Sequence, residues 1–246
     1  MSRVAETTSG RGPGTRVAQR LRTAALSLVD LLVPPRRRSP GRPRRVAVAH
    51  SDIVSSTHLL EAAGSAYPRL LVRHRALIAA AVARRGGEFL SHAGDGTLAV
   101  FDRADGALLA CVEAQRALAA EPWTEGLVPR VRMGVHVGDV FEIDGEPVGL
   151  VINHGARIMA AAQPGQVMVS AAAADAAAHD GPPGVGGFTV ADAGWHALRD
   201  HAGPVRLRQL VADGLRVVLP DSGHTIDLTV GTDRGAEVET LLDGVT

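Results

Sequence analysis

The sequence contains no lysine, and all 26 of its basic residues are arginines. Any step that other proteins assign to a lysine side chain must therefore be carried out by another group. The chain also has a single cysteine, Cys111. This excludes an internal disulfide framework and a zinc site built from several cysteines. So little cysteine fits a reducing, cytoplasmic setting.

Aromatic residues make up only 3 % of the chain, whereas 46 % of it is hydrophobic. Its 246 residues therefore predict a sizeable core built from Ala, Val and Leu. Long apolar runs are missing as well. Residues 24–33 are the longest candidate, but they fall short of the roughly 20 residues of a membrane span and contain Asp30. Since the chain also opens without a secretory hydrophobic segment, we expect a cytoplasmic protein.

Charge is unevenly distributed, although the chain is neutral as a whole. Residues 1–45 hold eleven arginines against Glu6 and Asp30, a net charge of about +9. We interpret them as a basic, partly disordered segment with a short amphipathic helix over 15–33 and a linker over 34–45. The linker is either a solvated tether or a weak contact for acidic lipid headgroups at the inner membrane surface. Nucleic-acid binding is disfavoured because base-stacking aromatics are nearly absent.

Residues 46–211 predict one compact domain, and residues 212–246 a tail without an assigned role. Strands are expected over 46–50, 88–92, 97–101, 130–143, 166–170, 187–192 and 204–210, and helices over 57–85 (interrupted at Pro68), 105–120, 151–162 and 171–178. The order of these elements indicates an α+β fold with a ferredoxin-like βαββαβ core and extra strands.

Two acidic residues occupy matching places in this topology. Asp52 follows the first strand, and Asp95 lies at the tip of the hairpin between residues 88 and 101. The first strand of such a sheet lies beside the hairpin, so the two carboxylates are expected to converge and to suit Mg²⁺ or Mn²⁺. Taken alone, Asp52 also fits a helix cap and Asp95 a tight Gly-Asp-Gly turn.

A second polar pair lies on the helix predicted over 151–162. Asn153 and Arg157 are spaced i, i+4, so they share one helix face. An arginine there can bind phosphate and stabilise developing charge, and an asparagine can hold a ribose by hydrogen bonding. An exposed polar stripe explains the pair equally well when it is taken alone.

Four blocks carry a family resemblance: HSDIVSST, GGEFLSHAGDGTLAVF, RVRMGVHVGDV and EPVGLVINHGARI. In this order and spacing, which are more specific than any single block, they resemble the catalytic domain of class III adenylate/guanylate cyclases. The likeness covers about residues 44–211. It implies the class III cyclase fold, a nucleoside triphosphate substrate and a head-to-tail homodimer with active sites shared between subunits.

The resemblance also implies roles for individual residues. Asp52 and Asp95, with the carbonyl of Ile53, correspond to the ligands of two Mg²⁺ or Mn²⁺ ions. Asn153 and Arg157 correspond to the ribose-orienting and transition-state-stabilising pair that the other subunit supplies. Two further arginines match phosphate contacts, the second more loosely because the family often has a lysine there: Arg132 and Arg199.

Two positions depart from the family. The residues expected to read the base are Ser91 and Glu146, where adenylate-forming members have Lys and Asp and guanylate-forming members usually have Glu and Cys. Hydrogen-bonding capacity does not choose between the bases, because a serine hydroxyl can donate to adenine or guanine and a carboxylate can accept from either. His50 also replaces a common Phe before the first metal motif. A lone strand histidine such as His50 or His92 fits a structural role better than that of a proton acceptor.

We therefore expect a phosphorus–oxygen lyase for cyclic-nucleotide signalling. It would convert ATP, favoured over GTP, to the 3′,5′-cyclic monophosphate and pyrophosphate. The 3′-hydroxyl would attack the α-phosphorus, activated by one metal ion, while the other ion and the arginines neutralise the leaving pyrophosphate. The alternative is a catalytically weak cyclase-like module that binds nucleotide or dimerises. Salt-sensitive DNA binding lost on deletion of residues 1–45 would favour a third class, a nucleic-acid binder.

Overall fold

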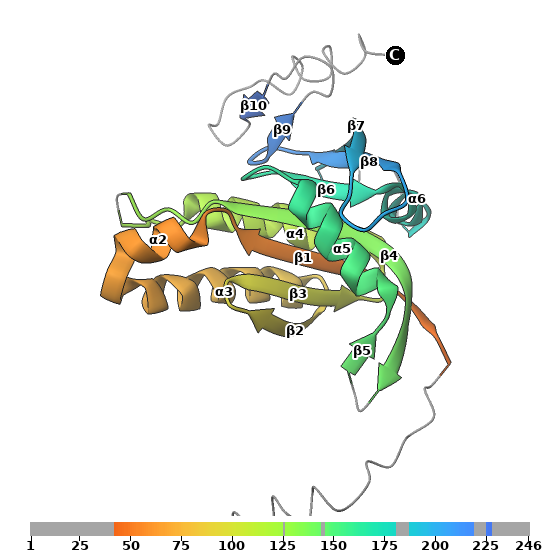
Figure 1. Ribbon diagram of the computed structural model, residues 1–246, viewed down its shortest axis with the longest axis horizontal. Coiled ribbons are helices and arrows are strands. Elements are labelled where there is room, and N and C mark those ends of the chain that lie inside the picture. Colours follow the sequence, from red (N-terminus) through yellow and green to blue (C-terminus); the bar gives the residue numbers. More distant parts are fainter. Residues whose placement is uncertain (1–41, 125, 144–145, 181–186, 219–224, 228–246) are drawn as a thin grey trace, which may run out of the picture. The chain divides into compact units, whose positions relative to one another are not determined.

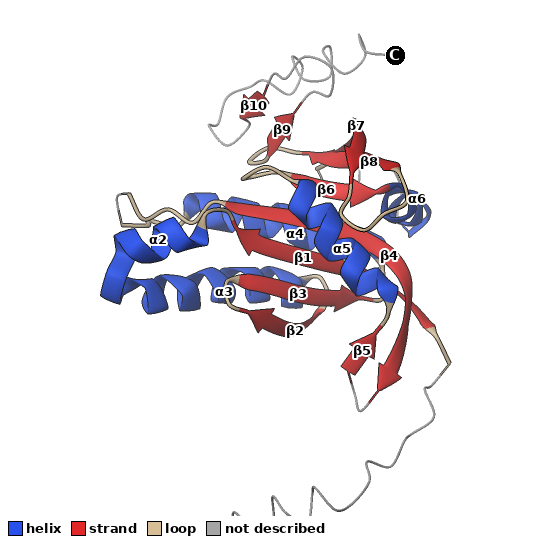
Figure 2. Ribbon diagram, viewed as in Figure 1, coloured by secondary structure: helices blue, strands red, loops and turns tan. Residues whose placement is uncertain are grey.

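The computed structural model describes residues 42–124, 126–143, 146–180, 187–218 and 225–227, without the side chains of residues 91–93, 146 and 225–227. Within these residues the chain forms an eight-stranded sheet and a separate two-stranded one. Figure 2 shows helices on both faces of the larger sheet.

The first part of the chain has the predicted βαββαβ order (Figure 1). Its elements are β1 (Arg44–Ile53), α2 (Ser56–Ala63), the 3₁₀ turn η1 (Gly64–Ala66), α3 (Tyr67–Arg84), β2 (Glu88–Ala93), β3 (Gly96–Phe101), α4 (Ala104–Ala120) and β4 (Val131–Ile143). The strands lie in the order β2-β3-β1-β4, each antiparallel to its neighbour. Pro68 stands in the first turn of α3, where a proline is tolerated, and separates that helix from α2. The predicted α+β, ferredoxin-like core is thus confirmed.

The remaining elements extend the sheet beyond β4. They are β5 (Glu146–Val148), α5 (Leu150–Ala161), β6 (Val167–Ser170), α6 (Ala171–Asp180), β7 (Thr189–Ala197) and β8 (Pro204–Val211). β5 folds back on the end of β4, α5 crosses over to β6, which is parallel to β4, and β8 and β7 follow. The short strands β9 (Arg216–Val218) and β10 (Thr225–Asp227) pair with each other.

The two faces of the large sheet are covered by different helices. The main core cluster joins α3, α4 and α6 to one face, and it consists largely of alanine and valine, as the composition predicted. Two smaller clusters join α5 to the opposite face, through Val151 and Ile158. Because most of these side chains are small, the helices pack closely on the strands.

Glycines allow α5 to lie unusually close to the sheet. A Cβ atom at Gly134 of β4 would lie 2.3 Å from the backbone nitrogen of Met159 in α5. A Cβ atom at Gly155 of α5 would lie 2.8 Å from both the His50 ring and the Val48 side chain of β1. Real Cβ atoms do not approach this closely, so the two glycines set the depth at which α5 and its polar residues lie.

The observed elements differ from the predicted ones in several places; β7, for example, ends at Ala197 rather than at residue 192. β1 does not end at residue 50 but runs to Ile53, because Asp52 pairs with Arg132 of β4; Asp52 therefore lies inside the strand rather than after it. β5 was not predicted. Beyond residue 211 the packing continues, since Ala212, Leu215 and Val217 are buried.

The division into residues 1–45, 46–211 and 212–246 stays a prediction. The amphipathic helix expected over 15–33 lies outside the described residues. Among the helices that the structure describes, none has the length and apolarity needed to cross a membrane.

Candidate functional site

Asp52 and Asp95 meet at one end of the large sheet. Asp52 is the penultimate residue of β1, and Asp95 lies in the turn between β2 and β3. β1 and β3 are antiparallel neighbours in which Ser51 pairs with Thr97, so the end of β1 lies beside this turn. The buried hydroxyls of Ser51 and Thr97 lie 2.6 Å apart and hydrogen bond across the pair. We call Asp52, Asp95 and Arg132 the acidic end.

Arg132 forms a hydrogen-bonded ion pair with Asp52. Its Nε and Nη2 donate to Oδ2 of Asp52 at 3.1 and 2.7 Å. Its Nη1 donates to the carbonyl oxygen of Ala160 in α5 at 3.1 Å. The arginine matched to a triphosphate contact therefore lies next to the carboxylates and connects them to α5.

The two carboxylates of the acidic end differ in their partners: Asp52 is bound by Arg132, whereas one oxygen of Asp95 has no hydrogen-bond donor among the described residues. Burial raises the pKa of Asp52 above its usual value; the hydrogen bond from Arg132 opposes this, and the negative charge of Asp95 adds to it. Oδ2 of Asp95 is buried and has no hydrogen-bond partner among the described residues. A buried carboxylate oxygen without a donor is costly unless a cation or water completes it.

This donor set fits a hard divalent cation. Two carboxylates side by side, one with an unpaired buried oxygen, are ligands that Mg²⁺ prefers. Ile53 is the last residue of β1 and its side chain is buried in the core, so only its carbonyl oxygen is available to a metal. In the described part of the chain no three His, Cys, Asp or Glu side chains gather into a metal site. A metal here would therefore take its remaining ligands from backbone, substrate and water.

Helix α3 supplies neighbours of the acidic end that the sequence analysis missed. Burial raises the pKa of Tyr67, and the charge of Asp95 adds to this. His74 is fully buried, and neither of its ring nitrogens has a hydrogen-bond partner in the described part of the chain. Burial lowers its pKa to about 4, although the charge of Asp95 acts in the opposite direction. Arg75 donates to the carbonyl of Gly94 and so holds the β2–β3 turn. The spacing of these α3 residues gave little signal, because only Tyr67 and His74, seven residues apart, share one side of the helix.

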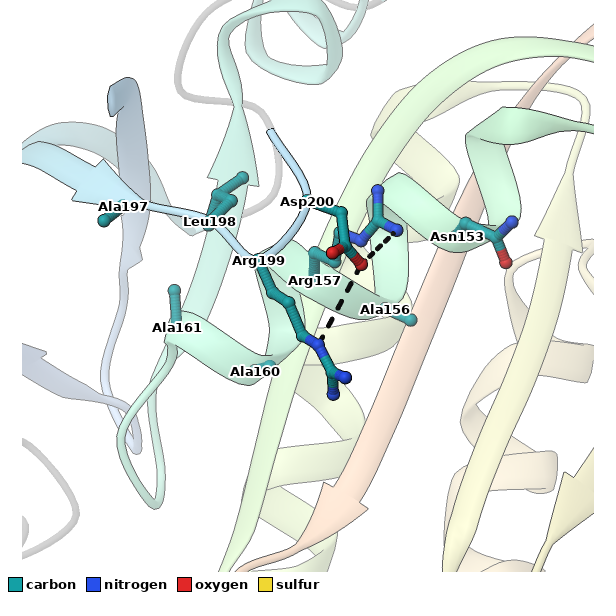
Figure 3. Close-up of a pocket in the computed structure, with 9 residues that line it drawn as sticks. All are labelled: Asn153, Ala156, Arg157, Ala160, Ala161, Ala197, Leu198, Arg199 and Asp200. Carbon is teal, nitrogen blue, oxygen red and sulfur yellow. Dashed lines mark hydrogen bonds and ion pairs between the residues drawn. The ribbon is translucent and has the colours of Figure 1, made fainter. Parts of the chain in front are cut away.

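A second cluster lines a pocket of about 500 Å³ between α5 and the loop that joins β7 to β8. The pocket holds three of the predicted residues, Asn153, Arg157 and Arg199, together with Asp200. Figure 3 shows the carboxylate of Asp200 between the two arginines, with Asn153 one turn away on α5. Nη2 of Arg157 donates to Oδ2 of Asp200 at 3.1 Å, and Nε of Arg199 lies 3.9 Å from the same oxygen. We call these residues the arginine pocket.

The structure places the two predicted base-reading residues by their backbones alone. Ser91 lies on β2 and pairs with Leu98 of β3, next to a register shift between Phe89 and Ser91. Glu146 is the first residue of β5 and pairs with Ile143 of β4. Their side chains are outside the described part of the structure, so their roles stay predictions.

The sequence has distant relatives among known proteins. No family model matches the chain. A putative adenylate cyclase from Rhizobium meliloti is 29 % identical over 171 residues, which are 68 % of this chain and 28 % of that protein. The chain spans less than two thirds of the length of the first known relatives that it matches.

Solved structures give the stronger likeness. Adenylate cyclases from Trypanosoma brucei, solved in their monomeric state, superpose with a TM-score of 0.64 at 21 % identity, over 80 % of this chain and 97 % of that chain. An adenylate/guanylate cyclase/hydrolase from Silicibacter pomeroyi superposes with a TM-score of 0.57 at 28 % identity, over 70 % of this chain and 99 % of that chain. The chain has the fold of class III adenylate/guanylate cyclase domains.

In this cyclase fold His50 has a structural position. Its ring is buried beneath α5, contacts the backbone of Ile152 through a hydrogen bond, and faces Gly155. Burial lowers the pKa of His50 to about 4, so the ring is neutral near pH 7. The side chain of His92 is outside the described residues.

The cyclase fold also reveals polar residues near the arginine pocket that the sequence analysis did not select. Asp200 follows Arg199 directly and has a left-handed backbone conformation, with φ of 56°. The rings of His136, His154 and His201 form a row, with centroids 5.7 and 6.1 Å apart. These residues come from β4, α5 and the β7–β8 loop, so sequence spacing gave no signal for their proximity.

Proposed function

We propose that this chain is a nucleotide cyclase that converts ATP, favoured over GTP, to its 3′,5′-cyclic monophosphate and pyrophosphate. The observation that carries the proposal is the grouping of the predicted residues into two clusters. Asp52, Asp95 and Arg132 form the acidic end, with Ile53 next to Asp52 in β1, and the arginine pocket holds Asn153, Arg157 and Arg199. The first cluster suits a metal and phosphate, and the second suits ribose and phosphate.

The proposed reaction is an in-line displacement at the α-phosphorus. The ribose 3′-oxygen forms a bond to phosphorus, the bond to the bridging oxygen of the β-phosphate breaks, and the 3′-hydroxyl proton passes to water. Bound at Asp52, Asp95 and the Ile53 carbonyl, Mg²⁺ or Mn²⁺ ions would supply Lewis-acid stabilisation of the 3′-oxygen and the phosphates. Arg157 would donate to phosphate oxygens as negative charge develops, and Asn153 would orient the ribose.

We assign the two clusters to different subunits of a homodimer. In this assignment the acidic end of one subunit faces the arginine pocket of its partner, and Arg132 and Arg199 contribute charge to the phosphates from the two sides. A shared site also explains why the acidic end holds the proposed metal ligands but no ribose-binding group, while the arginine pocket holds the reverse. Signalling inside the cell, at or near the inner membrane surface, is the setting we propose for such a product.

A weakly active module is the second candidate. Both Arg132 and Arg157 are engaged by carboxylates of the same chain. The residues proposed to read the base, Ser91 and Glu146, match neither adenylate-forming nor guanylate-forming members. Such a module would bind a nucleotide and form little cyclic product.

The deciding experiment incubates the full chain with Mn²⁺ or Mg²⁺ and either ATP or GTP, and separates cyclic AMP, cyclic GMP and pyrophosphate by chromatography. We expect cyclic product from at least one nucleotide and a loss of at least about 100-fold in Asp95→Ala. Asp95→Ala should stay folded, because it removes a buried oxygen that has no hydrogen-bond partner among the described residues.

The matched control is Asp102→Ala, which removes an exposed aspartate paired with Arg44 and should keep full activity. Product formation that survives in Asp95→Ala would refute the proposed metal site. Nucleotide binding without product in the unaltered chain would favour the weakly active module.

A further inference from the structure

Asp200 places a carboxylate between the two arginines of the arginine pocket (Figure 3). Its Oδ2 accepts from Nη2 of Arg157 at 3.1 Å and lies 3.9 Å from Nε of Arg199. All three side chains line the arginine pocket (Figure 3). A carboxylate oxygen and a phosphate oxygen accept the same kind of charge-assisted hydrogen bond from a guanidinium group. A phosphate entering this pocket must therefore compete with Asp200 for Arg157.

The loop that carries Asp200 is docked on α5 at a second point. The ring of His201 lies 6.1 Å from that of His154, which is on α5 between Asn153 and Arg157. Within the loop, the backbone nitrogen of His201 donates to the carbonyl of Leu198 at 3.2 Å, and Nδ1 of His201 lies 3.1 Å from the carbonyl oxygen of Gly203. The carboxylate is thus presented to Arg157 by a folded turn rather than by a free side chain.

The backbone at Asp200 has the left-handed conformation of a turn residue, with φ of 56°. Glycine adopts this conformation freely, and asparagine and aspartate adopt it more readily than other residues do. Because glycine or asparagine would serve the turn without a charge, the feature that the carboxylate adds is the ion pair with Arg157.

The ion pair is exposed enough to open. The Asp200 side chain is 66 % exposed and that of Arg157 is 27 % exposed. Exposed ion pairs are weak and exchange readily with other partners. With Asp200 displaced, Arg157 and Arg199 together present two positive charges to the pocket.

We propose that Asp200 is a displaceable counterion that occupies Arg157 in the free chain and lowers the affinity of the arginine pocket for nucleotide phosphates. The identity of the ligand rests on the proposed function, whereas the ion pair between Asp200 and Arg157 does not depend on it. This counterion role predicts that half-saturation of the arginine pocket needs a higher nucleotide concentration with Asp200 present than without it.

The first test measures binding of the α,β-methylene analogues of ATP and GTP, which cannot be cyclised, by calorimetric titration of the full chain with Mn²⁺. We expect Asp200→Asn and Asp200→Gly to bind the preferred analogue about two- to fivefold more tightly, the range expected for an exposed ion pair. Asp192→Asn is the matched control, because it breaks a similarly exposed ion pair with Arg206 on β7 and β8 and should leave affinity unchanged. Unchanged or weaker binding in both Asp200 variants would overturn the proposal.

The second test does not depend on nucleotide binding. Phenylglyoxal modifies accessible arginines, and peptide mapping by mass spectrometry gives the labelling rate of Arg157 relative to the exposed Arg69. We expect Arg157 to react about two- to fivefold faster in Asp200→Asn than in the unaltered chain or in Asp192→Asn. Equal rates would show that Asp200 does not protect Arg157. Faster labelling without binding of either analogue would support the ion pair and refute the proposed nucleotide ligand.

Discussion

The acidic end and the arginine pocket each contain an arginine held by a carboxylate, but the two pairs are built differently. Arg132 and Asp52 stand directly opposite each other on paired strands, and Arg132 also donates to α5. Arg157 and Asp200 lie on a helix and a loop, and Asp200 is far more exposed than Asp52, at 66 % against 24 %. The Arg132–Asp52 pair is therefore fixed by the pairing of β1 with β4, whereas the Arg157–Asp200 pair depends on the position of the β7–β8 loop against α5. We therefore expect the Arg132–Asp52 pair to hold two strands together and the Arg157–Asp200 pair to limit access of a ligand.

The largest effect on cyclase activity is expected when the acidic end is damaged in one subunit and the arginine pocket in the other. Asp52→Ala and Arg157→Ala should each be inactive alone, since each damages every site of its homodimer. Mixed in equal amounts and allowed to exchange subunits, they should regain about a quarter of the unaltered activity, because half of the dimers are mixed and each of these has one intact site. The measurement is cyclic product against mixing ratio.

A matched control decides whether the recovery comes from shared sites. Asp52→Ala mixed with Asp95→Ala damages the same region in both subunits, so no mixed dimer has a complete site. This mixture should stay inactive. Equal recovery in both mixtures, or none in either although mixed dimers form, would contradict the assignment of the two regions to different subunits.

A second comparison concerns the histidines buried near each region. Burial is the main cause that lowers the pKa of His74, near the acidic end, to about 4, and it does the same to His136. In both cases the folded pKa lies below the unfolded value of about 6.5, so the folded state favours the neutral ring. Their contribution to stability is complete above about pH 6.5 and is lost as the pH falls towards 4, on the order of 1–3 kcal/mol for the fully buried His74 and less for the half-buried His136.

Urea unfolding between pH 7.5 and 4.5 measures this loss. His74→Leu should unfold at a higher urea concentration and should lose less stability on acidification, because it removes a buried ring with no hydrogen-bond partner among the described residues. Val72→Ala is the control, since Val72 is exposed on α3 and its replacement removes no titratable group, so the pH dependence should be unchanged. An identical pH dependence in His74→Leu would show that His74 does not resist protonation.

The smallest expected effect is the difference in unfolding free energy between variants that break the Arg132–Asp52 pair and the Arg157–Asp200 pair. Arg132→Ala leaves the half-buried carboxylate of Asp52 without its donor and should lower the free energy of unfolding by about 1–3 kcal/mol. Asp200→Ala should lower it by less than about 1 kcal/mol, because its pair is exposed. Urea titrations of both variants at pH 7.5 make the comparison, and equal losses would remove the distinction between a pair fixed by strand pairing and a displaceable one.

The sheet was predictable from the sequence because its signals are local. Short apolar runs and the Gly-Asp-Gly turn at Asp95 indicated the first strand and the hairpin, and the βαββαβ order then placed them side by side. From that adjacency the proximity of Asp52 and Asp95 followed. The end of β1 was misplaced because polar residues follow His50, although pairing with β4 keeps the strand extended through Ile53.

The contacts of the arginine pocket could not be predicted in the same way. The sequence selected Asn153, Arg157 and Arg199 by spacing and resemblance, but not Asp200. Its ion pair with Arg157 spans 43 residues and depends on the docking of a turn with a left-handed residue. The burial of His74 likewise depends on packing between α3 and the sheet, which helical periodicity alone did not resolve.

The position of Cys111 has a practical consequence for spectroscopy. It is the only cysteine of the chain, it is buried in α4, and burial raises the pKa of its thiol to about 12. Thiol reagents act on the thiolate, so the native thiol should be inert towards maleimides and spin labels. A cysteine introduced at the exposed Val72 of α3 would then carry the only label on each chain. Pulsed electron resonance on that label would report the separation of two subunits without any other cysteine having to be removed.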